Sequence, residues 1–219
     1  MERASGALSG LAYGDALGAP TEFMTVAEIE HRYGPGGPRD LEGDPALVTD
    51  DTQMTLAVAR ALVGGLDGIA DALRDHFVRW WESPDNNRAP GMTCLQACER
   101  LAAGLPWREA RGWDECAAAL DVLAAAAPDR DADPCLAAGA GWVAEEAPAT
   151  ALHCFLLFRD DPVAALSRAA TTSGDSDSIA CLTGAFAGAT HGFDAWPAEW
   201  AERIEHGAEP AALGRGWDR

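Results

Sequence analysis

The chain has 219 residues, 48% of them hydrophobic, and its 35 acidic side chains outnumber 16 basic ones to give a net charge of −19. This charge repels phosphate backbones and anionic lipid surfaces, so we expect neither a nucleic acid nor a membrane as a partner. The length suits one well-buried core and no long linker divides it, so we expect a single domain over residues 1–219. Alanine is abundant and β-branched residues are scarce, which predicts an all-α fold.

The location of the protein is also suggested by its sequence. No stretch reaches the roughly 18 uncharged apolar residues of a membrane span, and the Gly-rich start does not resemble a secretory leader. We therefore expect a cytoplasmic protein. Its six cysteines include no CxxC pair, which favours free thiols over a metal site.

Small residues form two stripes of helical spacing. The opening segment places glycine at positions 6, 10, 14 and 18, on one face of a helix. A second stripe contains Ala180, Gly184 and Gly188. Because each glycine costs a helix about 1 kcal/mol relative to alanine, we interpret both stripes as faces against which another backbone packs closely.

The other elements follow from periodicity and from the position of Gly and Pro. Loops are predicted at 34–45, 83–91 and 171–174, with a turn at Pro106 and a solvated acidic loop at 128–134. Helices are predicted at 52–62, 69–81, 93–103, 114–127, 141–158 and 162–170, after Asp177, and from Pro197 onward.

The chain contains two acidic clusters, Thr49-Asp50-Asp51-Thr52 and Asp175-Ser176-Asp177-Ser178. Each is followed by apolar residues spaced to form one face of a helix. Each alone is typical of a helix N-cap with acids favoured by the helix dipole. If the fold brings the two helix ends together, four carboxylates would repel one another by several kcal/mol, and a pair of divalent cations would neutralise them. Ligands that are all oxygen select Mg²⁺, Mn²⁺ or Ca²⁺, and two such ions can orient an anionic substrate and activate water.

Glutamate, histidine and tryptophan residues are further candidates for a functional role. Glu22 follows the first glycine stripe and is either another metal ligand, a general base or an exposed loop acid. His153 lies among apolar residues, which favours a core position. The eight tryptophans favour core packing, since no one of them is singled out as a stacking surface.

Taken in order along the chain, these motifs resemble those of the ADP-ribosylglycohydrolase family. The matching segments are GLAYGDALGAPTEF at 10–23, VTDDTQMTLA at 48–57, RAPGMT at 88–93, GDSDSIA at 174–180 and WPAEW at 196–200. The segments cover both ends of the chain. The combination of TDD with DSDS is specific, whereas either half alone is not.

The resemblance implies a compact all-α helical bundle with two Mg²⁺ or Mn²⁺ ions that cleaves the glycosidic bond between ADP-ribose and an acceptor. Its implied partner is ADP-ribose or an ADP-ribosylated substrate. The implied metal ligands are Thr49, Asp50, Asp51, Asp175, Asp177 and Ser178. The implied catalytic residues are Glu22, Asp50, Asp51 and Asp177, and a loop near the diphosphate would bind substrate through Arg88, Gly91 and Thr93.

One part of the family pattern is missing. The Gly-rich segment and the Thr-His helix expected in the central part are not found, and residues 105–110 run almost directly into residues 111–114. The chain therefore resembles a family member shortened in the middle. Two alternatives to a hydrolase stay open: a non-catalytic ADP-ribose-binding or structural relative that keeps the metal site, and a metal phosphohydrolase.

Overall fold

A computed structural model describes residues 2–88, 90–105 and 128–218. These residues form helices joined by loops and contain no β-strand, only an isolated bridge between Ala46 and Ile204. The predicted all-α class is confirmed. The predicted turn at Pro106 and helix at 114–127 lie outside the described residues.

The chain divides into two compact units. One contains residues 1–47 and 112–219, and the other contains residues 48–111, so the second is inserted into the first. The expectation of a single domain over residues 1–219 remains a prediction. Among the described helices, none is long and apolar enough to cross a membrane.

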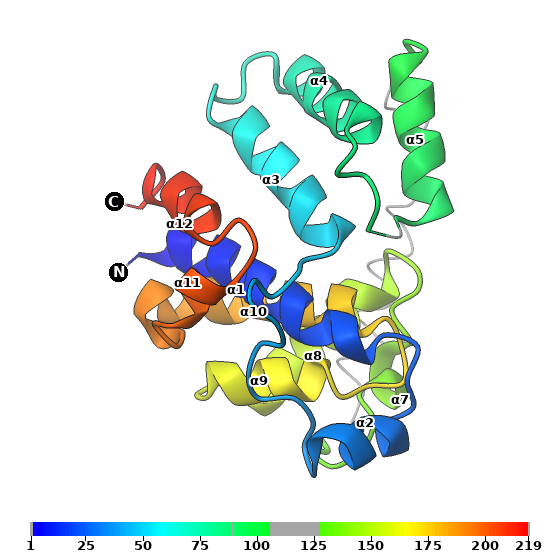
Figure 1. The fold of residues 1–219 in the computed structure, drawn as a ribbon, viewed down its shortest axis with the longest axis vertical. Coiled ribbons are helices and arrows are strands. Elements are labelled where there is room, and N and C mark those ends of the chain that lie inside the picture. Colours follow the sequence, from blue (N-terminus) through cyan, green and yellow to red (C-terminus); the bar gives the residue numbers. More distant parts are fainter. Residues whose placement is uncertain (1, 89, 106–127, 219) are drawn as a thin grey trace. The chain divides into compact units, whose positions relative to one another are not determined.

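The first unit is built around two antiparallel helices, α1 (Arg3–Gly18) and α10 (Ser176–His191), which lie side by side in Figure 1. The two small-residue stripes face each other. A Cβ on Gly14 would lie 2.0 Å from the Ala180 carbonyl oxygen, and one on Gly188 would lie 1.9 Å from the Gly6 carbonyl oxygen. The predicted close approach is confirmed, because only glycine lets the backbones come this near.

Other helices of the first unit pack around this pair. Helices α8 and α9 contact α10, and α12 contacts α1. The elements are η1 (Ala19–Thr21), α2 (Val26–Tyr33), α7 (Cys135–Ala138), α8 (Glu146–Leu157), α9 (Pro162–Ala169), η3 (Phe193–Ala195), α11 (Trp200–Arg203) and α12 (Ala208–Arg215). His153 is buried in α8, as predicted.

Two helices begin later than predicted, and a further helix was not predicted. Helix α8 begins at Glu146 rather than at position 141, because Gly141 has φ +83° and its N–H donates to the Glu146 carboxylate. Pro197 precedes a turn, and α11 begins at Trp200. Helix α2 was not predicted, although the capping box of Thr25 and Glu28 was readable in the sequence.

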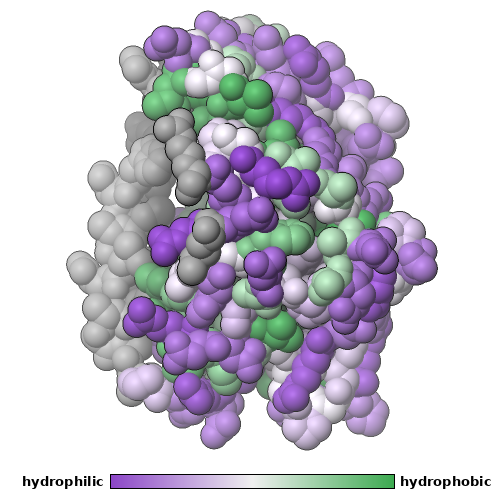
Figure 2. Space-filling view, turned by 90° about the vertical axis from the view of Figure 1, so that its left-hand side faces the viewer, coloured by the Kyte–Doolittle hydropathy of each residue, from purple (hydrophilic) through white to green (hydrophobic). Residues whose placement is uncertain are grey.

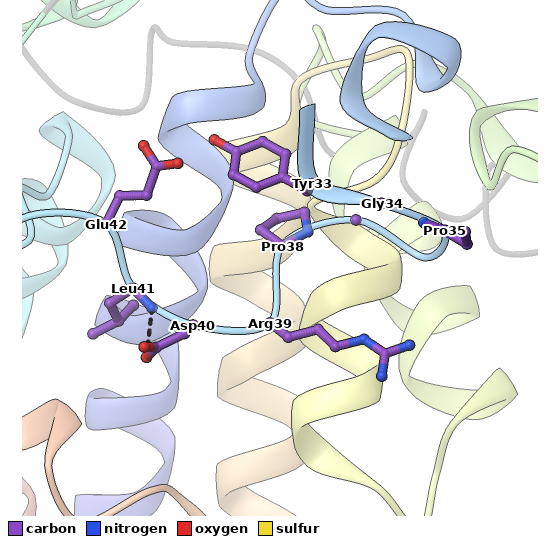
Figure 3. A pocket seen from close by; sticks show the side chains of 9 residues that line it. Tyr33, Gly34, Pro35, Pro38, Arg39, Asp40, Leu41 and Glu42 are labelled. Carbon is purple, nitrogen blue, oxygen red and sulfur yellow. Dashed lines mark hydrogen bonds between the residues drawn. The ribbon is translucent and has the colours of Figure 1, made fainter. Parts of the chain in front are cut away.

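The predicted loop after α2 is confirmed and is fixed to the rest of its unit. Asp40 accepts hydrogen bonds from the Leu41 N–H (2.9 Å), the Trp200 indole (2.8 Å) and Arg203 (2.9 Å). Figure 3 shows the first of these bonds, and it shows the Arg39 side chain extending away from Glu42. The loop is therefore an ordered part of the first unit.

The second unit contains α3 (Asp50–Leu62), α4 (Ile69–Glu82) and α5 (Met92–Ala102), close to the predicted ranges. Helix α4 packs on both α3 and α5. A buried hydrogen bond of 2.9 Å from the Trp80 indole to the Gln53 amide joins α3 to α4.

Polar side chains cover much of the molecular face in Figure 2, in keeping with the excess of acids.

Candidate metal centre and active site

The helix pair of the first unit determines where the later acidic cluster lies. Because α1 and α10 are antiparallel, the end of α1 meets the start of α10: a Cβ on Gly18 would lie 2.6 Å from the Asp177 Cα. Thr21 is fully buried and donates to the carbonyls of Gly18 (2.8 Å) and Ala170 (2.7 Å). Its hydroxyl also lies 3.1 Å from that of Ser176. These contacts hold the next residue, Glu22, beside the N-terminus of α10.

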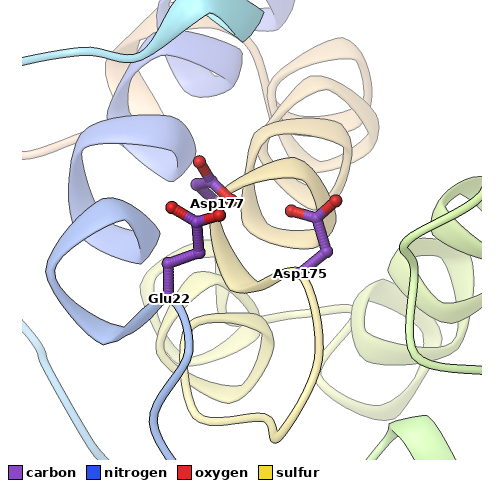
Figure 4. A group of neighbouring side chains, drawn as sticks. All are labelled: Glu22, Asp175 and Asp177. Carbon is purple, nitrogen blue, oxygen red and sulfur yellow. The ribbon is translucent and has the colours of Figure 1, made fainter. Parts of the chain in front are cut away.

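Three carboxylates converge at this point. Oxygen atoms of Glu22, Asp175 and Asp177 lie within 4.8 Å of one another. Figure 4 shows Glu22 reaching in from the segment after α1, while the two aspartates come from the start of α10. The sequence left open whether Glu22 is a loop acid or a member of the site, and the structure places it with the aspartates.

The surroundings of Asp177 oppose ionisation of its carboxyl group. Asp177 is only 7% exposed, and burial, together with the hydrogen-bonded and negatively charged Asp175, raises the pKa of Asp177 to about 8. The Ser178 N–H donates to Asp177 (3.0 Å) and, more weakly, to Asp175 (3.4 Å), so the helix N-terminus offsets only part of this cost. A cation bound at this point would favour the ionised form of all three groups.

This donor set fits a divalent cation. It presents carboxylate oxygens alone, which Mg²⁺ and Mn²⁺ prefer, and the spacing of the oxygens permits shared coordination. The described cysteines are free thiols, as predicted, and do not belong to the cluster.

The loop leading into Asp175 is held by a residue that the sequence did not single out. Asp133 accepts hydrogen bonds from the Thr172 hydroxyl (2.8 Å) and from both the hydroxyl and the N–H of Ser173. Burial opposes ionisation of Asp133, but these bonds and others prevail and lower its pKa. The prediction of a solvated loop at 128–134 is therefore wrong for Asp133. No signal in the sequence paired it with Thr172.

An aromatic pair adjoins the cluster. The rings of Phe23 and Trp142 stack with centroids 5.4 Å apart and planes at 12°, although the residues are 76% and 49% exposed. Phe23 directly follows Glu22 and has φ +64°, which is unusual for a bulky residue. Gly141 precedes Trp142, and a Cβ on Gly141 would lie 3.3 Å from the Asp175 Cβ. Stacking residues were not singled out from the sequence.

The earlier acidic cluster lies in the second unit. Thr49 caps α3 by accepting from the Asp51 N–H (3.2 Å), so the predicted helix N-terminus is confirmed. Asp50 is partly buried, which raises its pKa. Burial likewise raises the pKa of Cys94, and the charges of Asp50 and Asp51 contribute, which places this thiol near both acids.

The predicted substrate loop belongs to the same unit. Arg88 donates to the Val48 carbonyl (3.0 Å), which brings the loop to the residue before Thr49. Gly91 is the N-cap of α5, and Thr93 is exposed in the first turn of that helix. The second unit thus gathers the TDD motif and the RAPGMT loop.

A family model described as ADP-ribosylglycohydrolase matches residues 1–134 and 109–217. The chain belongs to the ADP-ribosylglycohydrolase family. The resemblance and the all-α fold type predicted from the motifs are confirmed.

Known relatives agree with this assignment. The chain is 27% identical over 270 aligned residues to an ADP-ribosyl-[dinitrogen reductase] glycohydrolase of Rhodospirillum rubrum, covering 93% of this chain and 90% of the relative. It is 37% identical over 117 residues to the ADP-ribosylarginine hydrolase Tri1 of Serratia proteamaculans strain 568, covering 49% of this chain and 31% of that relative. The first alignment exceeds the 219 residues of this chain, so that relative has residues with no counterpart here.

A solved structure shares the fold of this family member. A protein described as an ADP-ribosylglycohydrolase-related protein complex superposes with a TM-score of 0.64 at 25% sequence identity. The match covers 97% of this chain and 95% of the other.

Proposed function

We propose that this chain is a metal-dependent ADP-ribosyl hydrolase that cleaves the glycosidic bond between ADP-ribose and an acceptor. The observation that carries the proposal is the convergence of Glu22, Asp175 and Asp177 within 4.8 Å in a member of the ADP-ribosylglycohydrolase family. Two relatives whose names describe removal of ADP-ribose support it.

The proposed cofactor is a pair of Mg²⁺ or Mn²⁺ ions. Asp175, Asp177 and Ser178 would hold it from α10, and Thr49, Asp50 and Asp51 would hold it from α3, as the family motifs imply. When bound, such ions neutralise anionic groups and activate water. The support from this structure is the buried Asp177, whose pKa is raised by burial and by the adjacent Asp175 carboxylate, because a bound cation would offset both effects.

The residues of the chain have distinct proposed roles. Glu22 lies close enough to the aspartates to act as a ligand or to accept a proton from water. Arg88, Gly91 and Thr93 would contact the diphosphate, for which an arginine supplies matching charge. Thr21 keeps Glu22 in place through its buried hydrogen bonds.

A panel of ADP-ribosylated acceptors tests the proposal. Each acceptor is incubated with Mg²⁺, with Mn²⁺ or with a chelator, and released ADP-ribose is measured. We expect release with metal from the wild type and from the Asp71→Asn control, which changes an exposed acid on α4. Asp177→Asn should abolish release.

Two results would contradict the hydrolase proposal in different ways. ADP-ribose binding without any release would support the non-catalytic alternative that lacks turnover. Formation of AMP or free phosphate from ADP-ribose would instead support a metal phosphohydrolase.

A further inference from the structure

The first unit contains a cavity of about 700 Å³ beside α9, within the size range of small-molecule sites. It is formed by the loop after α2, the end of α8, α9 and the segment near position 130. The three residues of the acidic cluster do not line it. Three arginines do: Arg39, Arg130 and Arg168.

Three arginines line one cavity in a chain with a large excess of acids. Its 16 basic residues are all arginine, and 35 acids outnumber them. Arg32 and Arg203 form ion pairs of 2.9 Å with Glu42 and Asp40. By contrast, none of the three cavity arginines forms an ion pair with a carboxylate in the part of the chain that the structure describes.

Arg168 is the most buried of the three arginines. It is only 8% exposed and donates to the Thr171 carbonyl, while its Nε has no hydrogen-bond partner among the described residues. A buried guanidinium without a counter-charge is costly, so an anion entering the cavity would relieve this cost.

The other two arginines, Arg39 and Arg130, line the same cavity. The Arg130 guanidinium lies over the Phe158 ring, 4.9 Å from its centroid, which limits the directions it can take. The Arg39 side chain extends away from Glu42 in Figure 3. The loop carrying Arg39 is anchored on α9, because the Ser167 hydroxyl hydrogen-bonds with the carbonyls of Gly36 and Pro38, each at 2.7 Å.

The cavity also contains hydrogen-bond acceptors. Glu30, Asp131 and Asp161 line it together with the arginines. Asp161 accepts from the Ala164 N–H at 3.0 Å, which fixes it at the N-terminus of α9. Carboxylates repel a bare anion but accept hydrogen bonds from hydroxyl groups. Guanidinium groups and carboxylates together therefore suit a ligand that has an anionic group and several hydroxyls.

We propose that this cavity binds a small hydroxylated phosphate ester, of the sugar phosphate class, with its phosphate on Arg39, Arg130 and Arg168. Three guanidinium groups match a phosphate dianion better than a single carboxylate, because each can offer two parallel N–H donors. The hydroxyls of the ester would be bound by Glu30, Asp131 and Asp161. The site is separate from the proposed ADP-ribosyl hydrolase centre.

Calorimetric titration of the full chain with glucose 6-phosphate tests the proposal. The titration is done with a chelator present, so that no metal at the acidic cluster recruits phosphate. We expect saturable binding to the wild type. Binding should weaken at least about tenfold in an Arg39→Ala/Arg130→Ala double variant, in which two exposed residues are changed.

Control titrations isolate the two parts of the ligand. Arg159→Ala removes a neighbouring exposed arginine that does not line the cavity, and it should leave binding unchanged. Glucose without phosphate should not bind, and inorganic phosphate should bind more weakly than glucose 6-phosphate. Failure of the wild type to bind glucose 6-phosphate, or equal binding by the double variant, would overturn the proposal. Equal binding of inorganic phosphate would overturn the assignment of the hydroxyls.

Discussion

Gly14 of α1 and Ala180 of α10 lie so close that a Cβ on Gly14 would fall 2.0 Å from the Ala180 carbonyl oxygen. This contact belongs to a row that runs from Gly6 opposite Gly188 to Gly18 opposite Ser176. The row fixes the register of the two helices, and the register places Glu22 beside Asp175 and Asp177. Helix packing and the geometry of the candidate metal centre are thus linked.

Gly14→Ala should destabilise the protein by at least about 2 kcal/mol, because the new methyl group meets backbone that cannot move without shifting a whole helix. Thermal or urea unfolding measures the change. Gly64→Ala is the matched control, since its Cβ would meet only the Ala61 carbonyl oxygen at 3.8 Å, and it should stay within about 0.5 kcal/mol of the wild type. Equal effects of the two substitutions would show that the close approach is unimportant.

Asp177→Asn should change how stability depends on pH when no metal is present. The folded-state pKa of about 8 lies above the ordinary 3.8, so the contribution of Asp177 to stability is complete below pH 4 and is lost as pH rises toward 8. The wild type should therefore lose stability over this window relative to the variant, by about 5 kcal/mol at pH 8, since each unit of pKa shift corresponds to about 1.4 kcal/mol. Melting curves in chelator measure this. Parallel pH profiles for wild type and variant would contradict the prediction.

Asp133→Ala should weaken metal binding without removing a ligand. Asp133 holds Thr172 and Ser173, so its loss frees the loop that positions Asp175 and should cost about 1–3 kcal/mol of stability. Because the pKa of Asp133 is lowered, its contribution to stability is present above pH 4 and is lost as pH falls.

Calorimetry measures the Mn²⁺ affinity of Asp133→Ala. The control is Asp131→Ala, which changes an exposed residue of the same loop. Unchanged affinity in Asp133→Ala would exclude a positioning role.

Trp142→Ala should lower kcat/KM for ADP-ribose release by about 3- to 10-fold while leaving metal affinity unchanged. The stacked pair of Trp142 and Phe23 adjoins the acidic cluster, and stacking contacts are worth about 0.5–1.5 kcal/mol. Trp217→Ala changes another partly exposed tryptophan and serves as the control. The same kcat/KM in Trp142→Ala and Trp217→Ala would show that the aromatic pair does not contribute to the active site.

Local patterns in the sequence were sufficient to predict much of this structure. Glycine spacing predicted the contact between α1 and α10, and doubled acids next to Thr49 and at Asp175 predicted two helix N-termini. Contacts between distant segments left no such pattern. The bonds of Asp133 to Thr172 and the stacking of Phe23 on Trp142 depend on the folded path of loops, which periodicity does not describe. The start of α8 was misplaced because alanine-rich sequence hid the turn at Gly141.

The acidic cluster should bind the divalent cations on which ADP-ribose release depends. The most direct test measures metal stoichiometry and ADP-ribose release in the same samples, over a titration with Mn²⁺ or Mg²⁺. We expect release and thermal stability to rise together with metal occupancy in the wild type, and both responses to be lost in Asp175→Asn and Asp177→Asn. ADP-ribose release that persists in chelator, or metal binding that survives in both variants, would contradict this expectation.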